Sequence, residues 1–192
     1  MNVFVTSDTH FGHAKILEFK KEDGRAVRPF ASLEKMHEEM VERWNRKVGT
    51  KDIVYHLGDV ATESNALKQL DRLNGSKILI KGNRDLFSLK DYSWYFYEIH
   101  GVLYQDNFIL SHIPVNEISL KGFKGNIHGH LHCHNIEGGK YFNACVENHD
   151  YAPVEWEKIE AYFAQSNGRA SDVQHAHSGA VESRHSQFAA CH

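Results

Sequence analysis

The sequence predicts an α/β domain organised around a parallel β-sheet. Short apolar runs rich in β-branched residues alternate with segments whose apolar residues recur at helical spacing, which is the pattern of βαβ units. The first three apolar runs each end in a polar turn that contains an aspartate or an asparagine. Because ligands of such sheets bind beyond the carboxyl ends of the strands, we expect the functional site at these turns.

The first half of the chain is expected to contain buried strands and two helices. The strands are predicted at Met1–Ser7, Asp52–Leu57 and Lys77–Lys81. One helix begins after Ser32, which is a suitable N-cap, and ends at Gly49. The second helix spans Glu63–Leu73, with its leucines on one face that should pack in the core.

The second half of the chain predicts shorter strands, at Asn107–Ser111, Gly125–Ile127 and Lys140–Cys145. The last of these follows Gly138-Gly139, so we expect it to be the second arm of a hairpin. The aromatic run Tyr92–Tyr97 is interpreted as an amphipathic strand of the core, with a surface that faces a nucleobase as the alternative. A final helix is predicted at Pro153–Phe163.

The composition predicts one folded domain over residues 1–164 and a disordered tail over residues 165–192. The tail holds five serines, one aromatic residue and no periodic apolar pattern, so it has too little apolar surface to offset the entropy of ordering. The whole chain of 192 residues is 41% hydrophobic and 24% charged, which is ordinary for a globular protein.

Charge and cysteine content restrict the expected partners and location. The formal net charge of -3 gives no reason to expect nucleic acid or a membrane surface as a partner. No apolar run reaches the roughly 18 residues of a membrane span, and the start of the chain does not have the pattern of a signal peptide. The three cysteines form no CxxC pair, which favours the reducing cytoplasm over a disulfide-stabilised protein.

The stretch Asn126–His134 has histidine at four alternate positions. In an extended segment, residues two apart lie roughly 6.5 Å apart on the same side, which is wide for ligands of one ion. This spacing suits two neighbouring ions, which two-metal sites hold about 3.5–4 Å apart. Gly129 would supply the backbone freedom for the necessary bend. The alternative is a polar loop in a histidine-rich protein.

Polar motifs recur in a fixed order at the ends of the predicted strands. They are D-x-H at Asp8 and His10, G-D at Asp59, G-N-x-D at Asn83 and Asp85, a single His112, and G-H-x-H at His130 and His132. Each residue alone has an ordinary explanation, such as a helix cap for Asp8, a turn for Asn83 or a core position for His112. Together, and in this order, the motifs resemble those of the calcineurin-like metallophosphoesterase superfamily over roughly Met1–Phe163.

The resemblance implies a fold of two packed mixed β-sheets flanked by helices, and a site for two divalent metal ions. Asp59 would bridge the two ions, with Asp8, His10 and His132 completing one site and Asn83, His112 and His130 the other. Mixed oxygen and imidazole ligands suit borderline ions, with manganese the first expectation and iron, zinc or nickel the alternatives. The implied activity is hydrolysis of a small phosphodiester or phosphomonoester by a metal-bridged hydroxide.

One position departs from the superfamily pattern, which usually has G-N-H followed by Asp or Glu. Here the histidine is replaced by Arg84, which can grip a phosphate but cannot act as a general acid near neutral pH. Arg84 and Asp85 are therefore expected in the catalytic site, with Asp85 supporting a ligand or Arg84, and His13 of the first turn could contact substrate.

Two other functions are compatible with parts of the pattern. The first is a metal-binding or partner-binding module that keeps the fold with weakened or lost catalysis, as the replacement at Arg84 suggests. The second is metal-dependent amide hydrolysis, but the helical H-E-x-x-H motif of such enzymes is absent from the sequence.

Overall fold

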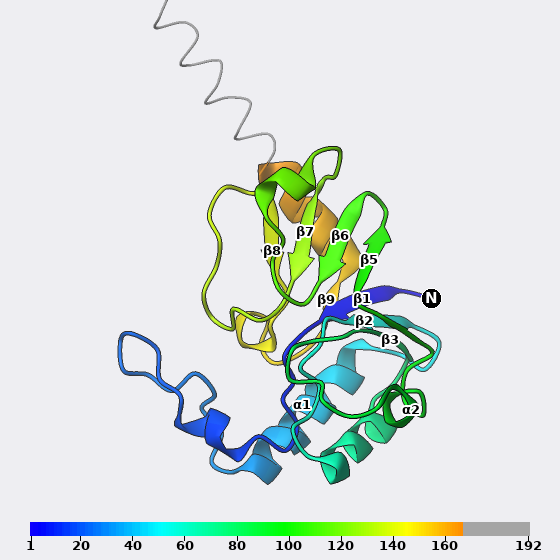
Figure 1. The fold of residues 1–192 in the computed structure, drawn as a ribbon. Helices are drawn as coiled ribbons and strands as arrows, with labels where there is room; N and C mark the ends of the chain where they lie inside the picture. The colour runs from blue at the N-terminus through cyan, green and yellow to red at the C-terminus, as the bar shows by residue number, and fades with distance from the viewer. Residues whose placement is uncertain (167–192) are drawn as a thin grey trace, which may run out of the picture.

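The structure is a computed structural model that describes residues 1–166, and its centre is formed by two β-sheets (Figure 1). The first sheet has the strand order β4-β3-β2-β1-β9. Its strands are β1 (Val3–Thr6), β2 (Ile53–His56), β3 (Ser76–Ile80), β4 (Glu98–His100) and β9 (Val154–Glu155). Strands β1 to β4 pair in parallel, and β9 runs antiparallel to β1 at the edge.

The second sheet has the strand order β5-β6-β7-β8. Its strands are β5 (Val102–Gln105), β6 (Phe108–Ser111), β7 (Gly125–His128) and β8 (Tyr141–Asn143). Only the β5–β6 pair is antiparallel. Both sheets are therefore mixed, which confirms the predicted α/β class with two mixed sheets and helices.

Helices surround the sheets and agree with the predictions in part. The helix α1 (Leu33–Lys47) begins as predicted, because the Ser32 side chain accepts a hydrogen bond from the backbone N–H of Lys35. The second predicted helix is instead the 3-10 helix η2 (Ser64–Arg72), which begins without a side-chain cap. Its buried Ala66 and Leu67 lie four and three positions before the buried Leu70, so the apolar spacing does not distinguish the two helix types.

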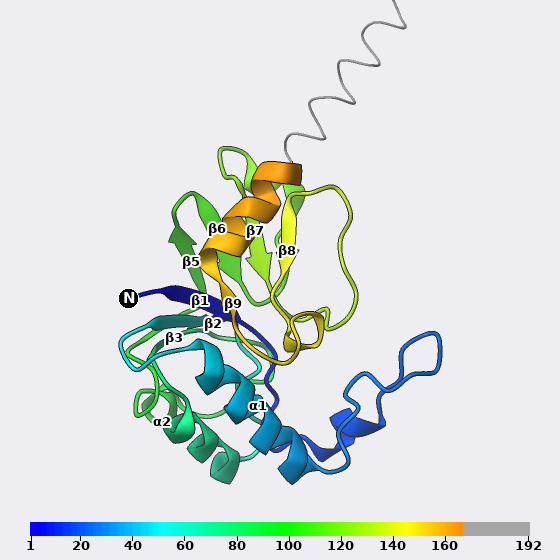
Figure 2. The same cartoon turned by 180° about the vertical axis from the view of Figure 1, so that it is seen from behind.

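The remaining helices are short, except for the last one. They are the 3-10 helices η1 (Ala14–Glu18), η3 (Glu117–Leu120) and η4 (Val146–Asn148), and the single-turn helix α2 (Leu89–Tyr92). The C-terminal helix spans residues 156–166 and runs across the second sheet in both views (Figures 1 and 2). Within residues 1–166, no helix combines the length and the apolarity that a membrane span requires.

Alternate residues of the first sheet build two separate cores, as the period of a strand requires. In β1, Phe4 faces the core beneath α1 and η2, and Val5 faces the core shared with the second sheet. Leu79 and Ile80 of β3 divide in the same way. The first sheet is thus buried on both faces, which explains its continuous apolar strands.

Two predictions about the second half were wrong, and a third, the last helix, was correct except at its N-terminal end. Strand β8 runs parallel to β7, so Lys140–Cys145 is not the second arm of a hairpin. The connection between them is about a dozen residues long, which is enough for a parallel crossover. The predicted helix Pro153–Phe163 begins with the two-residue strand β9, which is too short for a periodic pattern to reveal.

The aromatic run Tyr92–Tyr97 is not a strand. Ser88 and Asp91 form a capping box, which starts the helical turn α2 just before the run. Tyr92 and Phe96 consequently point into the core, whereas Trp94 and Tyr97 are exposed. The predicted tail, residues 165–192, lies outside the described residues apart from its first two positions, which belong to the C-terminal helix.

Candidate metal centre

Polar turns follow the carboxyl ends of five strands and meet at one place between the two sheets. They supply the side chains of all seven predicted metal ligands: Asp8, His10, Asp59 and Asn83 from the first sheet, and His112, His130 and His132 from the second. The backbone N–H of His130 donates to the Asp8 carboxylate (2.8 Å), so the turns of the two sheets are directly joined.

Most of these residues lie in the left-handed backbone conformation, which residues other than glycine rarely adopt. The positive φ angles are 59° at Asp8, 51° at His10, 55° at Asp59, 69° at His130 and 49° at His132. Each left-handed residue costs on the order of 1–3 kcal/mol, and such residues concentrate at functional sites. The turns after β1 and β2 stay paired, since the His10 N–H donates to the Asp59 carbonyl at 3.0 Å.

Gly129 is needed for close approach rather than for the bend that the sequence suggested. Its φ is not positive, and the bends of this loop occur at His130 and His132. A β-carbon at Gly129 would overlap Ser7 Oγ and Asp8 Oδ2. The glycine therefore lets the loop after β7 pack directly against the turn after β1.

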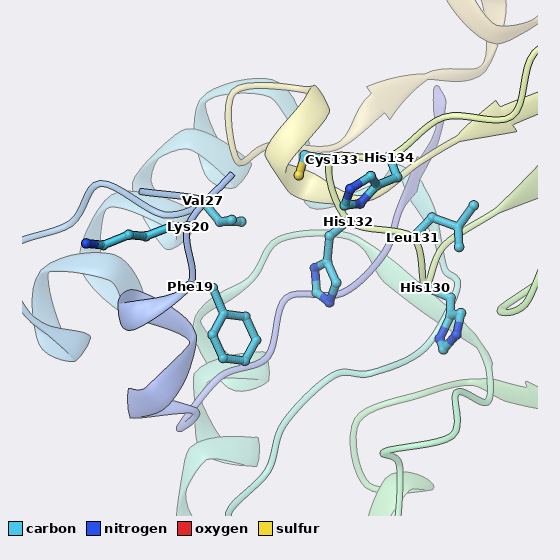
Figure 3. Close-up of a pocket in the computed structure, with 8 residues that line it drawn as sticks. All are labelled: Phe19, Lys20, Val27, His130, Leu131, His132, Cys133 and His134. Carbon is cyan, nitrogen blue, oxygen red and sulfur yellow. The ribbon is translucent and has the colours of Figure 1, made fainter. Parts of the chain in front are cut away.

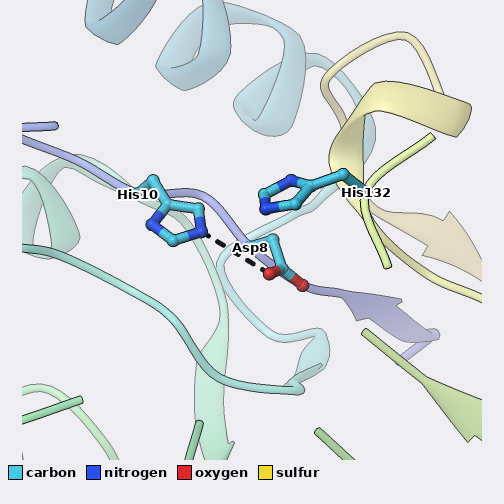
Figure 4. Close-up of side chains that lie close together, drawn as sticks. All are labelled: Asp8, His10 and His132. Carbon is cyan, nitrogen blue, oxygen red and sulfur yellow. Dashed lines mark ion pairs between the residues drawn. The ribbon is translucent and has the colours of Figure 1, made fainter. Parts of the chain in front are cut away.

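The first group of potential ligands consists of Asp8, His10 and His132, whose ligand atoms all lie within 4.8 Å of one another. His10 Nε2 is 3.5 Å from Asp8 Oδ1, and the rings of His10 and His132 are stacked with centroids 5.3 Å apart (Figure 4). Asp8 and His10 are buried, whereas His132 is half-buried and lies nearer the surface.

The second group gathers around His112. Its Nδ1 lies 2.8 Å from the Leu57 carbonyl, to which it can only donate, so a neutral ring presents the lone pair of Nε2 to the site. Nε2 is 2.7 Å from Asn83 Oδ1 and 3.5 Å from Asp59 Oδ1. The His130 ring lies edge-on to that of His112, at 5.1 Å. Several lone pairs thus converge, which is the arrangement that a cation stabilises.

Asp59 lies between the two groups. Its Oδ2 is 3.7 Å from His10 Nε2, and its Oδ1 is 3.5 Å from His112 Nε2. Burial raises the pKa of Asp59 despite the nearby imidazoles. A carboxylate buried among acceptors in this way is most stable when positive charge lies beside it.

Asp8 is also within reach of both groups, which the sequence did not predict. Its Oδ2 accepts hydrogen bonds from Ser7 Oγ (2.6 Å), His130 N (2.8 Å) and Cys145 Sγ (3.2 Å). These bonds leave Oδ1 as its single free ligand atom. Burial opposes the charge on Asp8, but its contacts with His10, His112 and Ser7 together outweigh that effect and hold the pKa well below the usual range.

The donor atoms fit divalent metal ions. Within residues 1–166, the buried polar atoms without a hydrogen-bond partner include Asp8 Oδ1 and both ring nitrogens of His10. Buried polar atoms normally have a partner, and a free carboxylate oxygen beside free imidazole nitrogens is the donor set of a borderline divalent ion.

Comparison with known proteins agrees with this geometry. The sequence profile of the calcineurin-like phosphoesterases matches residues 1–189 of the chain. The chain belongs to the calcineurin-like phosphoesterase family. The resemblance seen in the sequence motifs is therefore confirmed.

Three proteins of known sequence or structure are similar to this chain over different lengths. An uncharacterized protein of Methanocaldococcus jannaschii, MJ1445, is 33% identical over 168 residues, which cover 82% of this chain and 88% of the relative. The Gene 66 protein of Mycobacterium phage D29 is 38% identical over 90 residues, or 44% of this chain and 40% of that protein. The crystal structure of AQ665, a protein of unknown function from Aquifex aeolicus, superposes with a TM-score of 0.66 at 26% identity, covering 83% of this chain and 98% of that one.

A buried ion pair behind the centre was not predicted from the sequence. Arg28 is 1% exposed and donates to the carbonyls of Asp8 and Thr9 and to Glu147 Oε1. The same Glu147 oxygen lies 2.9 Å from His132 Nδ1. This carboxylate orients the imidazole and directs its Nε2 to the centre, as partners of metal-binding histidines usually do. Burial opposes the charge on Glu147, but Arg28 and His132 outweigh it and lower its pKa.

Glu147→Gln should lower the free energy of unfolding of the metal-free protein by about 3–5 kcal/mol, because Arg28 is left as a buried charge without a counterion. A carboxylate with a lowered pKa stabilises the fold above its ordinary value of 4.5 and loses that effect in acid. The difference from wild type should therefore shrink as the pH falls below that value. Urea unfolding at several pH values measures it.

Glu157→Gln, on the exposed side of the C-terminal helix, is the matched control and should change little. The affinity for manganese should also fall about 10–100-fold in Glu147→Gln, since His132 loses its orienting partner. Equal stability of the two variants at neutral pH would contradict the role given to Glu147.

Asp85, expected in the catalytic site, is 1% exposed and is bonded to the backbone that carries the ligands. Its oxygens accept from the N–H groups of Asp59 (2.8 Å), Val60 (2.9 Å) and Gly82 (2.7 Å). Tyr92 Oη donates to it as well (3.2 Å), and burial together with the Asp85 charge raises the pKa of Tyr92 well above its usual range. Asp85 thus fixes the turns after β2 and β3 relative to each other.

Asp85→Asn should destabilise the protein by several kcal/mol. The amide group can accept through one oxygen only, and each buried N–H without a partner costs about 1–3 kcal/mol. Tyr92→Phe removes one bond to the same carboxylate and should cost about 1 kcal/mol. Denaturant melts of the two variants compare the effects, and a Tyr92→Phe effect as large as that of Asp85→Asn would contradict this role.

Arg84 and His13 lie at the open side of the centre. Arg84 is exposed, and its backbone N–H donates to Asp59 Oδ1 at 2.8 Å. The His13 ring is 5.4 Å from that of His10. Burial, followed by the positive charges of His10 and Arg84, lowers the pKa of His13 to about 4. His13 is therefore neutral at pH 7.

Three further histidines lie behind the centre or outside it. His56 is fully buried between Thr9 Oγ1 (3.0 Å) and the Gly58 N–H (3.2 Å), and burial lowers its pKa to about 4. It joins the turns after β1 and β2 as a neutral ring. His128 is buried in β7, and His134 is exposed.

Proposed function

We propose that this protein hydrolyses phosphoesters with two divalent metal ions, manganese first and iron, zinc or nickel as alternatives. The observation that carries the proposal is the position of Asp59, whose two oxygens face His10 on one side and His112 on the other. Asp8, His10 and His132 would hold one ion together with Asp59. Asn83, His112 and His130 would hold the other.

When bound, such ions lower the pKa of water toward neutrality and neutralise charge on the phosphate. The side chains of the protein would position the ions and the phosphate. Asp59 would place its negative charge between the two ions, and Glu147 keeps the His132 ring in place. Arg84 binds phosphate oxygens through its guanidinium, which forms paired hydrogen bonds with such groups.

A small phosphate ester, either a monoester or a diester, is the proposed substrate. We also propose a cytoplasmic location, in agreement with the free thiols of Cys133 and Cys145. The second candidate function is a binding module with weakened catalysis. The observation that favours it is Arg84, which stands where the family usually has the histidine that assists the leaving group.

Metal analysis combined with a screen of phosphate esters tests the proposal. The purified chain should take up two equivalents of manganese and then hydrolyse bis(p-nitrophenyl) phosphate, with simple monoesters and cyclic esters as further substrates. Uptake of two equivalents without turnover of any ester would favour the binding module. Failure to bind divalent ions would contradict hydrolysis and a metal-binding module, and would favour a module that binds a partner.

A further inference from the structure

A pocket of about 450 Å³ opens beside the proposed metal centre (Figure 3). One side is formed by the arm, which we define as residues 14–28 and which projects from the body of the molecule (Figures 1 and 2). The other side is formed by the loop after β7, through His130, Leu131 and His132. Because two of these residues are proposed metal ligands, a phosphate bound at the centre has its substituent next to the pocket.

The walls of this pocket are mainly apolar and aromatic. Phe19, Val27 and Leu131 supply apolar side chains, and Lys20 points its ammonium group away from the two histidines (Figure 3). Phe19 is an exposed aromatic residue (46% exposed) within the otherwise charged segment Glu18–Lys21. Its ring meets that of His13 edge-on, at 6.0 Å and 89°. No carboxylate is among the described residues that line the pocket, so an anionic ester is not repelled.

The walls are fixed relative to the metal centre. The Val27 N–H donates to the Phe19 carbonyl (2.8 Å), which holds the two side chains of the arm together. The Val27 carbonyl accepts from Tyr151 Oη (2.8 Å), and the next residue, Arg28, is buried against Glu147. Since Glu147 also bonds His132, one carboxylate anchors both sides of the pocket. A pocket that is already formed loses little affinity to ordering.

We propose that this pocket binds the organic group of the substrate, and that this group carries a flat aromatic ring. This inference rests on the proposed function, because it places the phosphate at the metal centre. Aromatic rings pack well against the faces and edges of phenyl and imidazole rings. The volume is in the range of pockets that bury small organic ligands, and it accommodates an aryl ring or a nucleobase. Stacking and apolar burial of such a group typically increase affinity on the order of tenfold or more.

Binding of phosphonates to the manganese-loaded protein tests this proposal without turnover. Calorimetry should give a dissociation constant for phenylphosphonate about tenfold or more below that for methylphosphonate. An acyclic adenine nucleoside phosphonate, compared with phenylphosphonate, distinguishes a nucleobase site from an aryl site. Phe19→Ala should bring the ratio of phenyl to methyl affinity close to one. Leu131→Ala, on the opposite wall, is the second variant and should reduce the same ratio.

Tyr97→Ala is the matched control. Tyr97 is 82% exposed and precedes β4, at the end of the first sheet opposite the metal centre, so this variant should keep the wild-type ratio. Equal affinities of the wild type for the phenyl and methyl compounds would overturn the proposed role of the pocket. A preference for the phenyl compound that survives both Phe19→Ala and Leu131→Ala would overturn it as well. Ester hydrolysis without an aromatic preference overturns the pocket alone, whereas a protein that binds no phosphonate and hydrolyses no ester overturns the proposed function as well.

Discussion

Asp59→Asn should release bound metal and abolish phosphoester hydrolysis together. Asp59 is the residue whose two carboxylate oxygens face His10 and His112, respectively. An amide keeps the shape but removes the negative charge that separates two cations. Metal affinity and activity should each fall by more than the roughly 10–100-fold that is typical when a residue hydrogen-bonded to a metal ligand is removed. Metal content after gel filtration and turnover of bis(p-nitrophenyl) phosphate measure the two effects.

Asp106→Asn is the matched control for this substitution. Asp106 is exposed in the turn between β5 and β6, away from the centre, and its φ of 50° is close to the 55° of Asp59. The same chemical change in the same backbone conformation should leave metal content and turnover unchanged. If Asp59→Asn retained two equivalents of metal and near-normal turnover, Asp59 would not be the bridge, and Asp8, which is also within reach of both ligand groups, would be the next residue to test.

Wild-type hydrolysis should depend steeply on the leaving group, with nitrophenyl esters far ahead of alkyl esters. Arg84 remains charged near neutral pH and cannot donate a proton, although it can stabilise negative charge. His13 is neutral at pH 7, because burial and neighbouring positive charges lower its pKa to about 4. Neither residue therefore supplies the acid that an alkoxide leaving group requires.

Arg84→His introduces a group that titrates near neutral pH at this position. The variant should hydrolyse alkyl esters faster, within the roughly 10²–10⁴-fold range of general acid catalysis, and should lose this gain as the pH rises above the pKa of the new histidine. Initial rates for a series of alkyl and aryl esters, measured across pH, give both results. Arg46→His on the exposed face of α1 is the control. Unchanged leaving-group dependence in Arg84→His would mean that this residue is not near the scissile bond.

The sequence predicted the position of the centre because of a simple property of parallel strands. Asp8, Asp59 and Asn83 each follow a strand of the same sheet, and the carboxyl ends of parallel strands meet at one edge. Their side chains could therefore be placed together without knowledge of the loops. His112 and His130 follow parallel strands of the second sheet in the same way.

Other features could not be read from the sequence. Arg28 and Glu147 are 119 positions apart in the sequence. Their contact depends on the complete fold, so it could not be predicted from a local motif. The parallel pairing of β7 and β8 was missed because an apolar pattern identifies a strand but not its direction. Asp85 was expected to support a ligand or Arg84, but the sequence could not show that it does so by accepting from the backbone N–H groups of Asp59, Val60 and Gly82.

The left-handed residues at the centre set stability and function against each other during evolution. Glycine would relieve the conformational strain at Asp8, His10, Asp59, His130 and His132, but it would remove a ligand each time. As long as metal binding is selected, these positions cannot accept glycine, even though glycine would increase the stability of the metal-free protein. The chain must recover that stability elsewhere, and the first sheet, which packs against a core on each face, offers apolar contacts for this.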